Sequence, residues 1–166
     1  MEGIIISGFA GIGKTTIAEK YKNRIIDLES SDFKWVYEDD TTANMSKELR
    51  KGVSNRMLNP EWPRNYMKAI MEATKKFDVV LIAQGNDIRD LLDENRIEYR
   101  ICFPAVECKQ EYLDRYMARG NQQAFVELIK SNFETWVKDL MDCPQQKLIM
   151  QPGQHLEDVM KENGLI

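Results

Sequence analysis

The chain has one histidine, His155, and three cysteines, none of which belongs to a Cys-x-x-Cys pair. So few nitrogen and sulfur ligands argue against a zinc knuckle, a histidine metal centre and a Ser-His-Asp triad. The cysteines, Cys102, Cys108 and Cys143, are also too few and too scattered for a disulfide framework. We therefore expect reduced thiols and a cytoplasmic protein.

Long hydrophobic runs and an excess of basic residues are absent as well. The apolar runs at 4–6 and 79–83 are too short to span a membrane, and a strand that begins by residue 3 leads us to expect no signal peptide. The formal net charge of −4 provides no broad basic surface for nucleic acid. We expect one domain spanning 1–166, with neither a membrane nor an extended nucleic acid among its partners.

What the chain does contain is the run Gly-Phe-Ala-Gly-Ile-Gly-Lys-Thr at 8–15, which fits the pattern Gly, any four residues, Gly, Lys, Ser/Thr. A β-branched run at 3–7 predicts a buried strand before it, and 14–23 predicts a helix after it. A strand, a glycine-rich turn and a helix N-terminus form a cradle in which backbone N–H groups reach phosphate oxygens. A chance match is the alternative, but the strand, glycines, lysine and threonine all stand in register.

In such a cradle the Lys14 ammonium neutralises the β- and γ-phosphates of a nucleoside triphosphate, and the Thr15 hydroxyl ligates Mg²⁺. The sequence therefore predicts ATP and Mg²⁺ as cofactors. The predicted nucleotide-binding residues are Gly8, Ala10, Gly11, Ile12, Gly13, Lys14, Thr15, Thr16 and Arg115.

Five short strand patterns alternate with helical ones, which predicts a three-layer α/β P-loop NTPase fold. Right-handed crossovers place the strand before the P-loop in the middle of a five-stranded parallel sheet of order 2-3-1-4-5, with helices on both faces. The strands are predicted at 3–7, 24–28, 78–83, 98–103 and 147–151. The helices are predicted at 14–23, 62–77, 87–95, 106–119, 122–142 and 155–163.

Acidic residues follow the second predicted strand, at the edge of the sheet where ligands bind in open α/β folds. Asp27 and Glu29 lie on one side of that strand by alternation, and Asp32 follows them. Such acids hold Mg²⁺, accept a proton from a substrate hydroxyl or bind a sugar hydroxyl, and the alternative is a helix-capping role. We predict that Asp27 and Glu29 are catalytic, that Asp27 shares the metal with Thr15, and that Asp32 binds substrate.

The long segment 29–64 after this strand is predicted to be an acceptor-binding insertion, because long insertions in compact domains are usually functional. Its Arg50 and Arg56 are candidates for a substrate phosphate, although each is also an ordinary surface charge. Aromatic residues of the same segment and just beyond it offer faces for a base.

Gln84 directly follows the third predicted strand, at the place where many P-loop proteins have an acid for the metal. Arg89, a few residues further on, either reaches an anion or lies on a solvated helix face. Gln84 and Arg89 complete the predicted substrate-binding set.

Arg115 and Arg119 stand four residues apart, so they share one face of a helix in a predicted short lid at 112–124. Two guanidinium groups at one place suit a transferring phosphoryl group, whose oxygens carry the developing charge. The alternative is an amphipathic helix with purely structural ion pairs, such as Glu111 with Arg115. We predict that Lys14, Arg115 and Arg119 are catalytic.

The order of these features resembles the nucleoside and nucleotide kinase group of P-loop proteins, which has the adenylate-kinase-like fold. Small phage-type (deoxy)nucleoside monophosphate kinases are the most similar in size. The resemblance covers nearly the whole chain, but only the P-loop is highly specific. The chain departs from adenylate kinases at 84–89, where Gln-Gly-Asn-Asp-Ile-Arg replaces Asp-Gly-x-Pro-Arg, so adenylate kinase itself is disfavoured.

We therefore expect an ATP- and Mg²⁺-dependent phosphotransferase that acts, as a monomer or homodimer, on a small-molecule nucleotide, a (deoxy)nucleoside monophosphate. A phosphate acceptor is already ionised, so arginines and correct positioning suffice for its reaction. One alternative is a kinase of a hydroxyl acceptor (a nucleoside, a sugar acid or a polynucleotide 5′ end) that uses an acid after the second strand as base. Another is a non-catalytic nucleotide-binding regulator.

Overall fold

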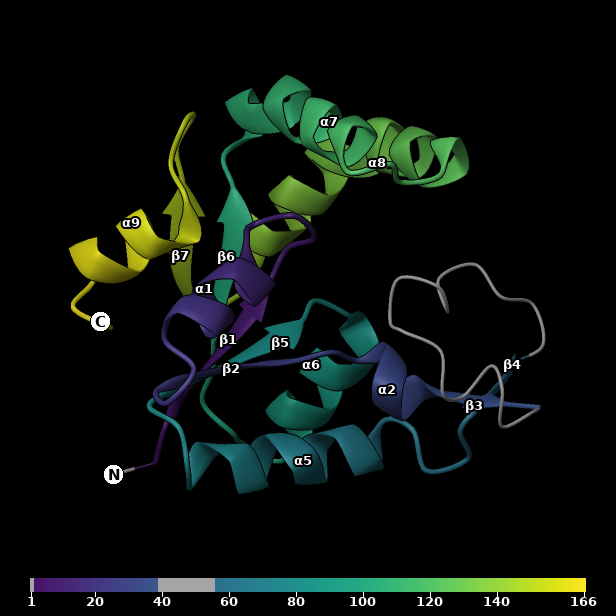
Figure 1. The fold of residues 1–166 in the computed structure, drawn as a ribbon, viewed down its shortest axis with the longest axis vertical. Coiled ribbons are helices and arrows are strands. Elements are labelled where there is room, and N and C mark those ends of the chain that lie inside the picture. The colour runs from purple at the N-terminus through teal and green to yellow at the C-terminus, as the bar shows by residue number, and fades with distance from the viewer. Residues whose placement is uncertain (1, 39–55) are drawn as a thin grey trace.

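A five-stranded parallel sheet forms the centre of the computed structural model, which describes residues 2–38 and 56–166 (Figure 1). The strands are β1 (Ile4–Gly8), β2 (Ile25–Leu28), β5 (Val79–Ala83), β6 (Arg100–Pro104) and β7 (Gln146–Met150). Their order is β2-β5-β1-β6-β7, and every neighbouring pair is parallel. When only the five strands of this sheet are numbered along the chain, the order is 2-3-1-4-5. The predicted fold class and strand order are therefore confirmed.

Helices cover both faces of the sheet and make the three layers of the fold (Figure 1). On one face α1 and α9 contact each other, and on the other α5 contacts α6 while α8 packs against β6. The helices are α1 (Lys14–Lys20), α5 (Arg64–Thr74), α6 (Asn86–Glu94), α7 (Lys109–Ala118), α8 (Gln123–Asp142) and α9 (Leu156–Glu162), with the 3₁₀ turn η1 (Val106–Cys108) before α7. No described helix has the length and apolar character needed to cross a membrane.

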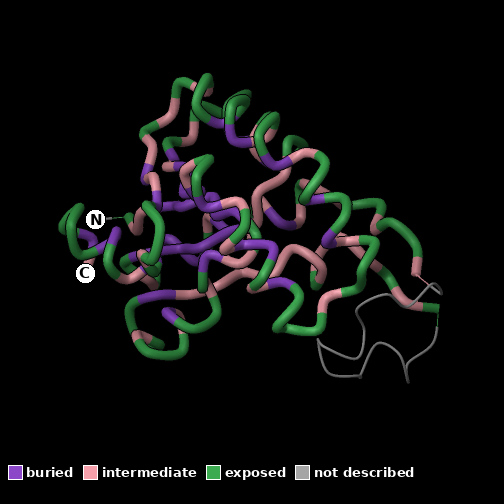
Figure 2. The backbone as a smooth tube through the Cα atoms, turned by 90° about the horizontal axis from the view of Figure 1, so that it is seen from above, coloured by how far each residue is buried: buried purple, intermediate pink, exposed green. Residues whose placement is uncertain are grey.

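The core lies in the sheet, where β1, β5 and β6 are buried along nearly their whole length (Figure 2). Their Ile, Val and Leu side chains are covered by helices on both faces, which explains the continuous apolar runs in place of a polar alternation.

The three cysteines are free thiols. Burial raises the pKa of the Cys102 thiol to about 12, so this residue is an inert part of the core.

The insertion after β2 contains more regular structure than the sequence predicted. A short helix, α2 (Ser31–Lys34), leads into β3 (Trp35–Tyr37), which pairs antiparallel with β4 (Arg56–Leu58). Strands of three residues are too short for period-two alternation to stand out in a sequence. This pair extends from the body of the molecule beside α2 (Figure 1).

Glu157 of α9 joins the two helices of one face. Its carboxylate accepts hydrogen bonds from Lys20 Nζ at 2.7 Å and from the Tyr21 hydroxyl at 3.0 Å, and it also pairs with Lys161. The bonds from Lys161, Lys20 and Tyr21 lower the pKa of Glu157 from its ordinary 4.5 to about 2. Folding therefore favours the ionised carboxylate.

We predict that Glu157→Gln lowers the free energy of unfolding at neutral pH and that the difference from wild type shrinks in acid. A lowered pKa contributes stability that is fully present above about 4.5 and is lost as the pH falls to about 2. Urea unfolding of both proteins at several pH values measures the difference. A difference that stays constant from pH 7 to pH 3 would contradict the assigned bonds.

Candidate active site

The P-loop connects β1 to α1 at the carboxyl edge of the sheet. Gly11 and Gly13 have φ angles of +82° and +95°, which side chains rarely adopt. Among the described residues, no amide of 11–13 donates to another backbone carbonyl, so these N–H groups are available to an anion. The loop has the backbone expected of a phosphate cradle.

Helix α7 holds the other side of this loop. The Tyr116 hydroxyl donates to the Ala10 carbonyl at 2.6 Å, and Arg115 Nη1 donates to the Gly11 carbonyl at 3.3 Å. Burial raises the pKa of Tyr116 above its ordinary value, so its hydroxyl keeps the proton that this bond needs. The Ala10 and Gly11 carbonyls share peptide planes with the amides of Gly11 and Ile12, so these two bonds also fix the orientation of those amides.

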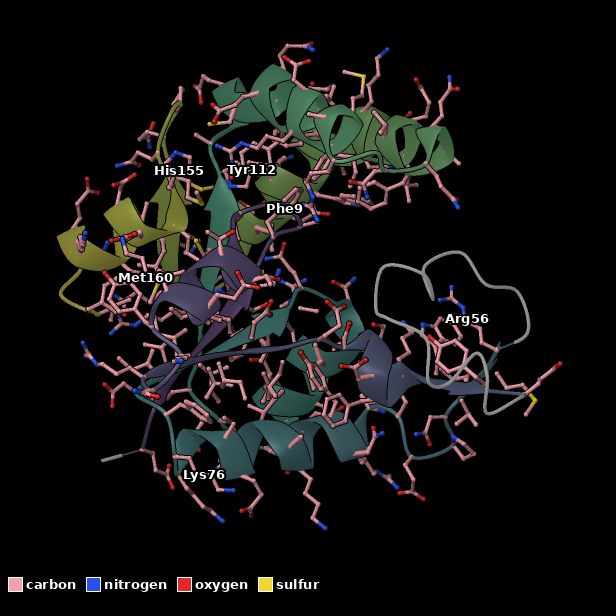
Figure 3. The ribbon with its side chains drawn as sticks, viewed as in Figure 1. Phe9, Arg56, Lys76, Tyr112, His155 and Met160 are labelled. Atoms are coloured by element: carbon pink, nitrogen blue, oxygen red, sulfur yellow. The ribbon has the colours of Figure 1, made fainter. Side chains whose placement is uncertain are left out.

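Phe9 fixes the start of the loop below α7 and α8 (Figure 3). Its buried ring meets the ring of Tyr112 edge-on with centroids 6.3 Å apart, and that of Phe133 with centroids 5.7 Å apart. Such edge-to-face aromatic contacts add to the stabilisation that burial provides. The loop is thus attached to the α7–α8 pair by packing as well as by hydrogen bonds.

The Lys14 ammonium lies above the loop, donating to the carbonyls of Gly8 at 3.1 Å and Phe9 at 3.4 Å. The same residue begins α1, whose N-terminus adds a partial positive charge at this point. The predicted lysine and the predicted backbone cradle therefore come together.

Thr15 and Asp27 also meet, as the sequence predicted for a metal site. Thr15 Oγ1 donates to Asp27 Oδ2 at 2.8 Å, and Asp27 Oδ1 is buried without a hydrogen-bond partner among the described residues. A hydroxyl and a carboxylate are the hard oxygen ligands that Mg²⁺ prefers. In the described part of the chain no group of three or more His, Cys, Asp or Glu side chains has an arrangement that could hold a metal ion.

The two lid arginines have different environments. Arg115 is half-buried and pairs with Glu111, whose other oxygen accepts the Gly153 amide at 3.1 Å. Arg119 caps the end of α7, is exposed, and forms no ion pair with a described residue. Arg115 thus connects the P-loop to the loop after β7, while Arg119 lies exposed at the end of α7.

A small cavity of about 80 Å³ lies between the insertion and the end of β5. It is lined by Ser30, Lys34, Trp62, Ala83, Gln84, Gly85, Asp87 and Ile88. Trp62 Nε1 donates to Asp87 Oδ2 at 2.7 Å, and Lys34 Nζ lies 3.8 Å from the same oxygen. Gln84 Nε2 is buried without a described partner, which leaves a donor at the cavity wall.

The structure places the other predicted substrate residues less favourably for binding in this cavity. The Arg56 guanidinium stacks above the ring of Trp35, 4.1 Å from its centroid (Figure 3). Arg89 donates hydrogen bonds to Asn86 and to Cys143 Sγ. Asp32 is exposed on α2, and Arg50 lies outside the described residues. Of the predicted substrate residues that the structure describes, Gln84 alone lines the cavity.

Sequence reasoning did not select Tyr116 or Lys34, and it considered Asp87 only as an alternative acid near the metal. A tyrosine in a helical stripe has the same pattern whether its hydroxyl is idle or bonded, so no local signal marks Tyr116. Asp87 and Lys34 carried a detectable signal, because Lys34 lies within the predicted insertion at 29–64 and Asp87 lies between the predicted substrate residues Gln84 and Arg89.

A larger hollow of about 1050 Å³ lies at the opposite edge of the sheet. It is lined by residues at the starts of β1, β6 and β7, among them Gly3, Arg100 and Gln146. The P-loop follows the other end of β1. Size alone therefore does not locate the nucleotide site.

We predict that Gly11→Ala destabilises the protein more than Gly120→Ala. A Cβ at Gly11 would lie 2.7 Å from Tyr116 Cε1, whereas one at Gly120, with a similar φ of +75°, has nothing within 4 Å. Backbone strain costs about 1–2 kcal/mol in both, and the clash adds about 1–3 kcal/mol at Gly11 alone. Urea unfolding measures both losses, and equal losses would show that Tyr116 does not pack against the loop.

Comparison with known proteins gives a likeness in fold. The chain is similar to a gluconokinase from Sinorhizobium meliloti 1021, with a TM-score of 0.50 and 17% identity, over 99% of this chain and 91% of that one. No protein-family model matches the chain, and no curated protein matches it. At this identity the likeness shows the fold alone, which is the three-layer α/β P-loop fold expected from the sequence.

Proposed function

We propose that the protein is an ATP- and Mg²⁺-dependent phosphotransferase whose acceptor is a hydroxyl group of a small polar molecule. The observation that carries the proposal is the Thr15–Asp27 pair beside the P-loop, with a buried carboxylate oxygen that has no hydrogen-bond partner among the described residues. Mg²⁺ held there would neutralise charge on the β- and γ-phosphates of ATP.

The P-loop residues have separate tasks in this proposal. The amides of 11–13 and the Lys14 ammonium bind the phosphates, and Arg115 and Arg119 approach the transferring group from α7. The reacting end of the acceptor lies at the cavity between Trp62 and Gln84, whose volume of about 80 Å³ holds only part of such a molecule. Its hydroxyl oxygen bonds to the γ-phosphorus as the bond between that phosphorus and the β–γ bridging oxygen breaks, and ADP leaves.

The proton of the acceptor hydroxyl passes to a carboxylate at the end of β2. A carboxylate that ligates Mg²⁺ is a weak base, because the cation stabilises its ionised form. We therefore assign the proton to Glu29, the next acid on the same side of the strand, and the metal to Asp27.

A hydroxyl acceptor is favoured over a nucleoside monophosphate by where the arginines lie. A second phosphate would need its own cations, yet Arg56 and Arg89 engage Trp35, Asn86 and Cys143 and do not line the cavity. The lining carries hydroxyl, amide, carboxylate and one ammonium group, which suits a polyhydroxy compound. The likeness to a gluconokinase, whose name denotes phosphorylation of a sugar acid, is consistent with this choice.

ADP release with a panel of nucleosides, nucleoside monophosphates and small sugar acids tests the acceptor class. We expect release above background with a nucleoside or a sugar acid. Asp27→Asn and Lys14→Ala should each lower it by about 100-fold or more, because charge on the phosphates goes uncompensated. Asp78→Asn, an exposed acid paired with Arg24 and far from the P-loop in the sheet register, is the matched control and should keep full activity.

Release with nucleoside monophosphates alone would move the assignment to a phosphate acceptor. No release with any acceptor, from a protein that binds ATP, would indicate a nucleotide-binding regulator.

For the lid, we predict that Arg115→Ala and Arg119→Ala lower kcat and kcat/KM together, by roughly 10²-fold, with little change in the KM for ATP. An interaction made mainly in the transition state has this kinetic effect. Steady-state kinetics of the two variants provide the measurement. Full kcat in both would mean that the arginines serve only the structure of α7.

A further inference from the structure

The hydroxyl of Tyr66 stands between β2 and β5 at the point where their pairing ends. It donates to the Leu28 carbonyl at 2.6 Å and accepts the Ala83 amide at 3.1 Å. The last register pair of the two strands is Leu28 with Ile82. In a parallel ladder the Leu28 carbonyl and the Ala83 amide are the groups that the next bond would join, so the hydroxyl is inserted into the ladder.

This insertion lies directly beside the cavity. The residues that follow on the two strands are Glu29 and Gln84, and Ser30, Ala83 and Gln84 belong to the cavity lining. One wall of the cavity follows β2 and the other follows β5. The Tyr66 hydroxyl therefore sets the distance between these two walls where they leave the sheet, at Leu28 and Ala83.

Tyr66 is itself held rigidly. It is completely buried, its ring stacks on Trp62 at 5.3 Å, and Phe33 packs on it at 5.2 Å. Burial, with the nearby Glu29, Asp27 and Asp32 carboxylates, raises the pKa of Tyr66 above its ordinary value, so the hydroxyl remains a donor to Leu28. Trp62, stacked on Tyr66, donates a hydrogen bond to Asp87 and so connects Tyr66 to the cavity wall that follows β5.

We infer that Tyr66, with Trp62 stacked on it, is a positioning residue for the acceptor, acting by holding β2 and β5 apart below the cavity. The inference rests on the proposed function and adds a determinant of acceptor binding that touches neither ATP nor the transferring phosphate. Without the hydroxyl, the Leu28 carbonyl and the Ala83 amide would bond directly, and Glu29 and Gln84 would move toward each other.

The test is Tyr66→Phe, assayed with whichever nucleoside or sugar acid of the panel has the highest kcat/KM. We expect the KM for that acceptor to rise about tenfold or more, while the Kd for ATP and the slow hydrolysis of ATP without acceptor stay within about twofold of wild type. Tyr21→Phe is the matched control, because its hydroxyl bonds Glu157 on the opposite face, and it should leave the acceptor KM unchanged.

An unchanged acceptor KM in a folded Tyr66→Phe protein would overturn the inference while the proposed function stands. An equal loss of ATP affinity would also overturn it, since the role would then be general stability. No acceptor-dependent release from wild type would overturn the proposed function, and the acceptor role of Tyr66 with it.

Should Tyr66→Phe fail to fold, Phe33→Leu provides the second variant. It removes the ring that packs on Tyr66 at 5.2 Å, and Phe33 is not among the residues that line the cavity. The same selective rise in acceptor KM is expected, and an unchanged KM would contradict the inference.

Discussion

The hydrogen bond from the buried Tyr116 hydroxyl to the Ala10 carbonyl is the contact on which the arrangement of the nucleotide site depends. It fixes the outer side of a loop whose glycines would otherwise allow many conformations. The same helix carries Arg115 and Arg119, so one rigid element positions both the cradle and the lid arginines. Because Gly11 leaves room for the Tyr116 ring, the glycine pattern serves this packing as well as the phosphates.

A second tyrosine does similar work on the other side of the site. Tyr116 joins helix α7 to the P-loop, and Tyr66 joins helix α5 to the ends of β2 and β5. In both cases a buried ring provides the rigidity and a hydroxyl bonded to backbone groups provides the geometry. The donor side and the acceptor side of the site are thus each fixed to the sheet by a helix of its own.

The fold could be predicted because its signals are local and repeated. Buried parallel strands are apolar along their whole length, their crossovers have one hand, and the P-loop marks the first βα junction. The meeting of Thr15 with Asp27 could also be predicted, because the ends of parallel strands share one edge of the sheet. These features need no knowledge of side-chain packing.

What could not be predicted depends on tertiary contacts between distant segments. Arg56 and Arg89 looked equivalent to any substrate arginine in the sequence, and only the fold shows Trp35 below one and Cys143 beside the other. The roles of Tyr66 and Tyr116 come from hydroxyl groups that reach backbone atoms 38 and 106 residues away. Such contacts leave no periodicity that a single sequence reveals.

The most direct test of the central claim is a crystal structure with a non-hydrolysable ATP analogue and Mn²⁺ in place of Mg²⁺, with the metal located by its anomalous scattering. The account predicts the β-phosphate within the loop 8–15, and the metal about 2.2 Å from Thr15 Oγ1 with Asp27 bound to it directly or through water. A nucleotide bound elsewhere, or a metal that contacts neither Thr15 nor Asp27, would contradict it.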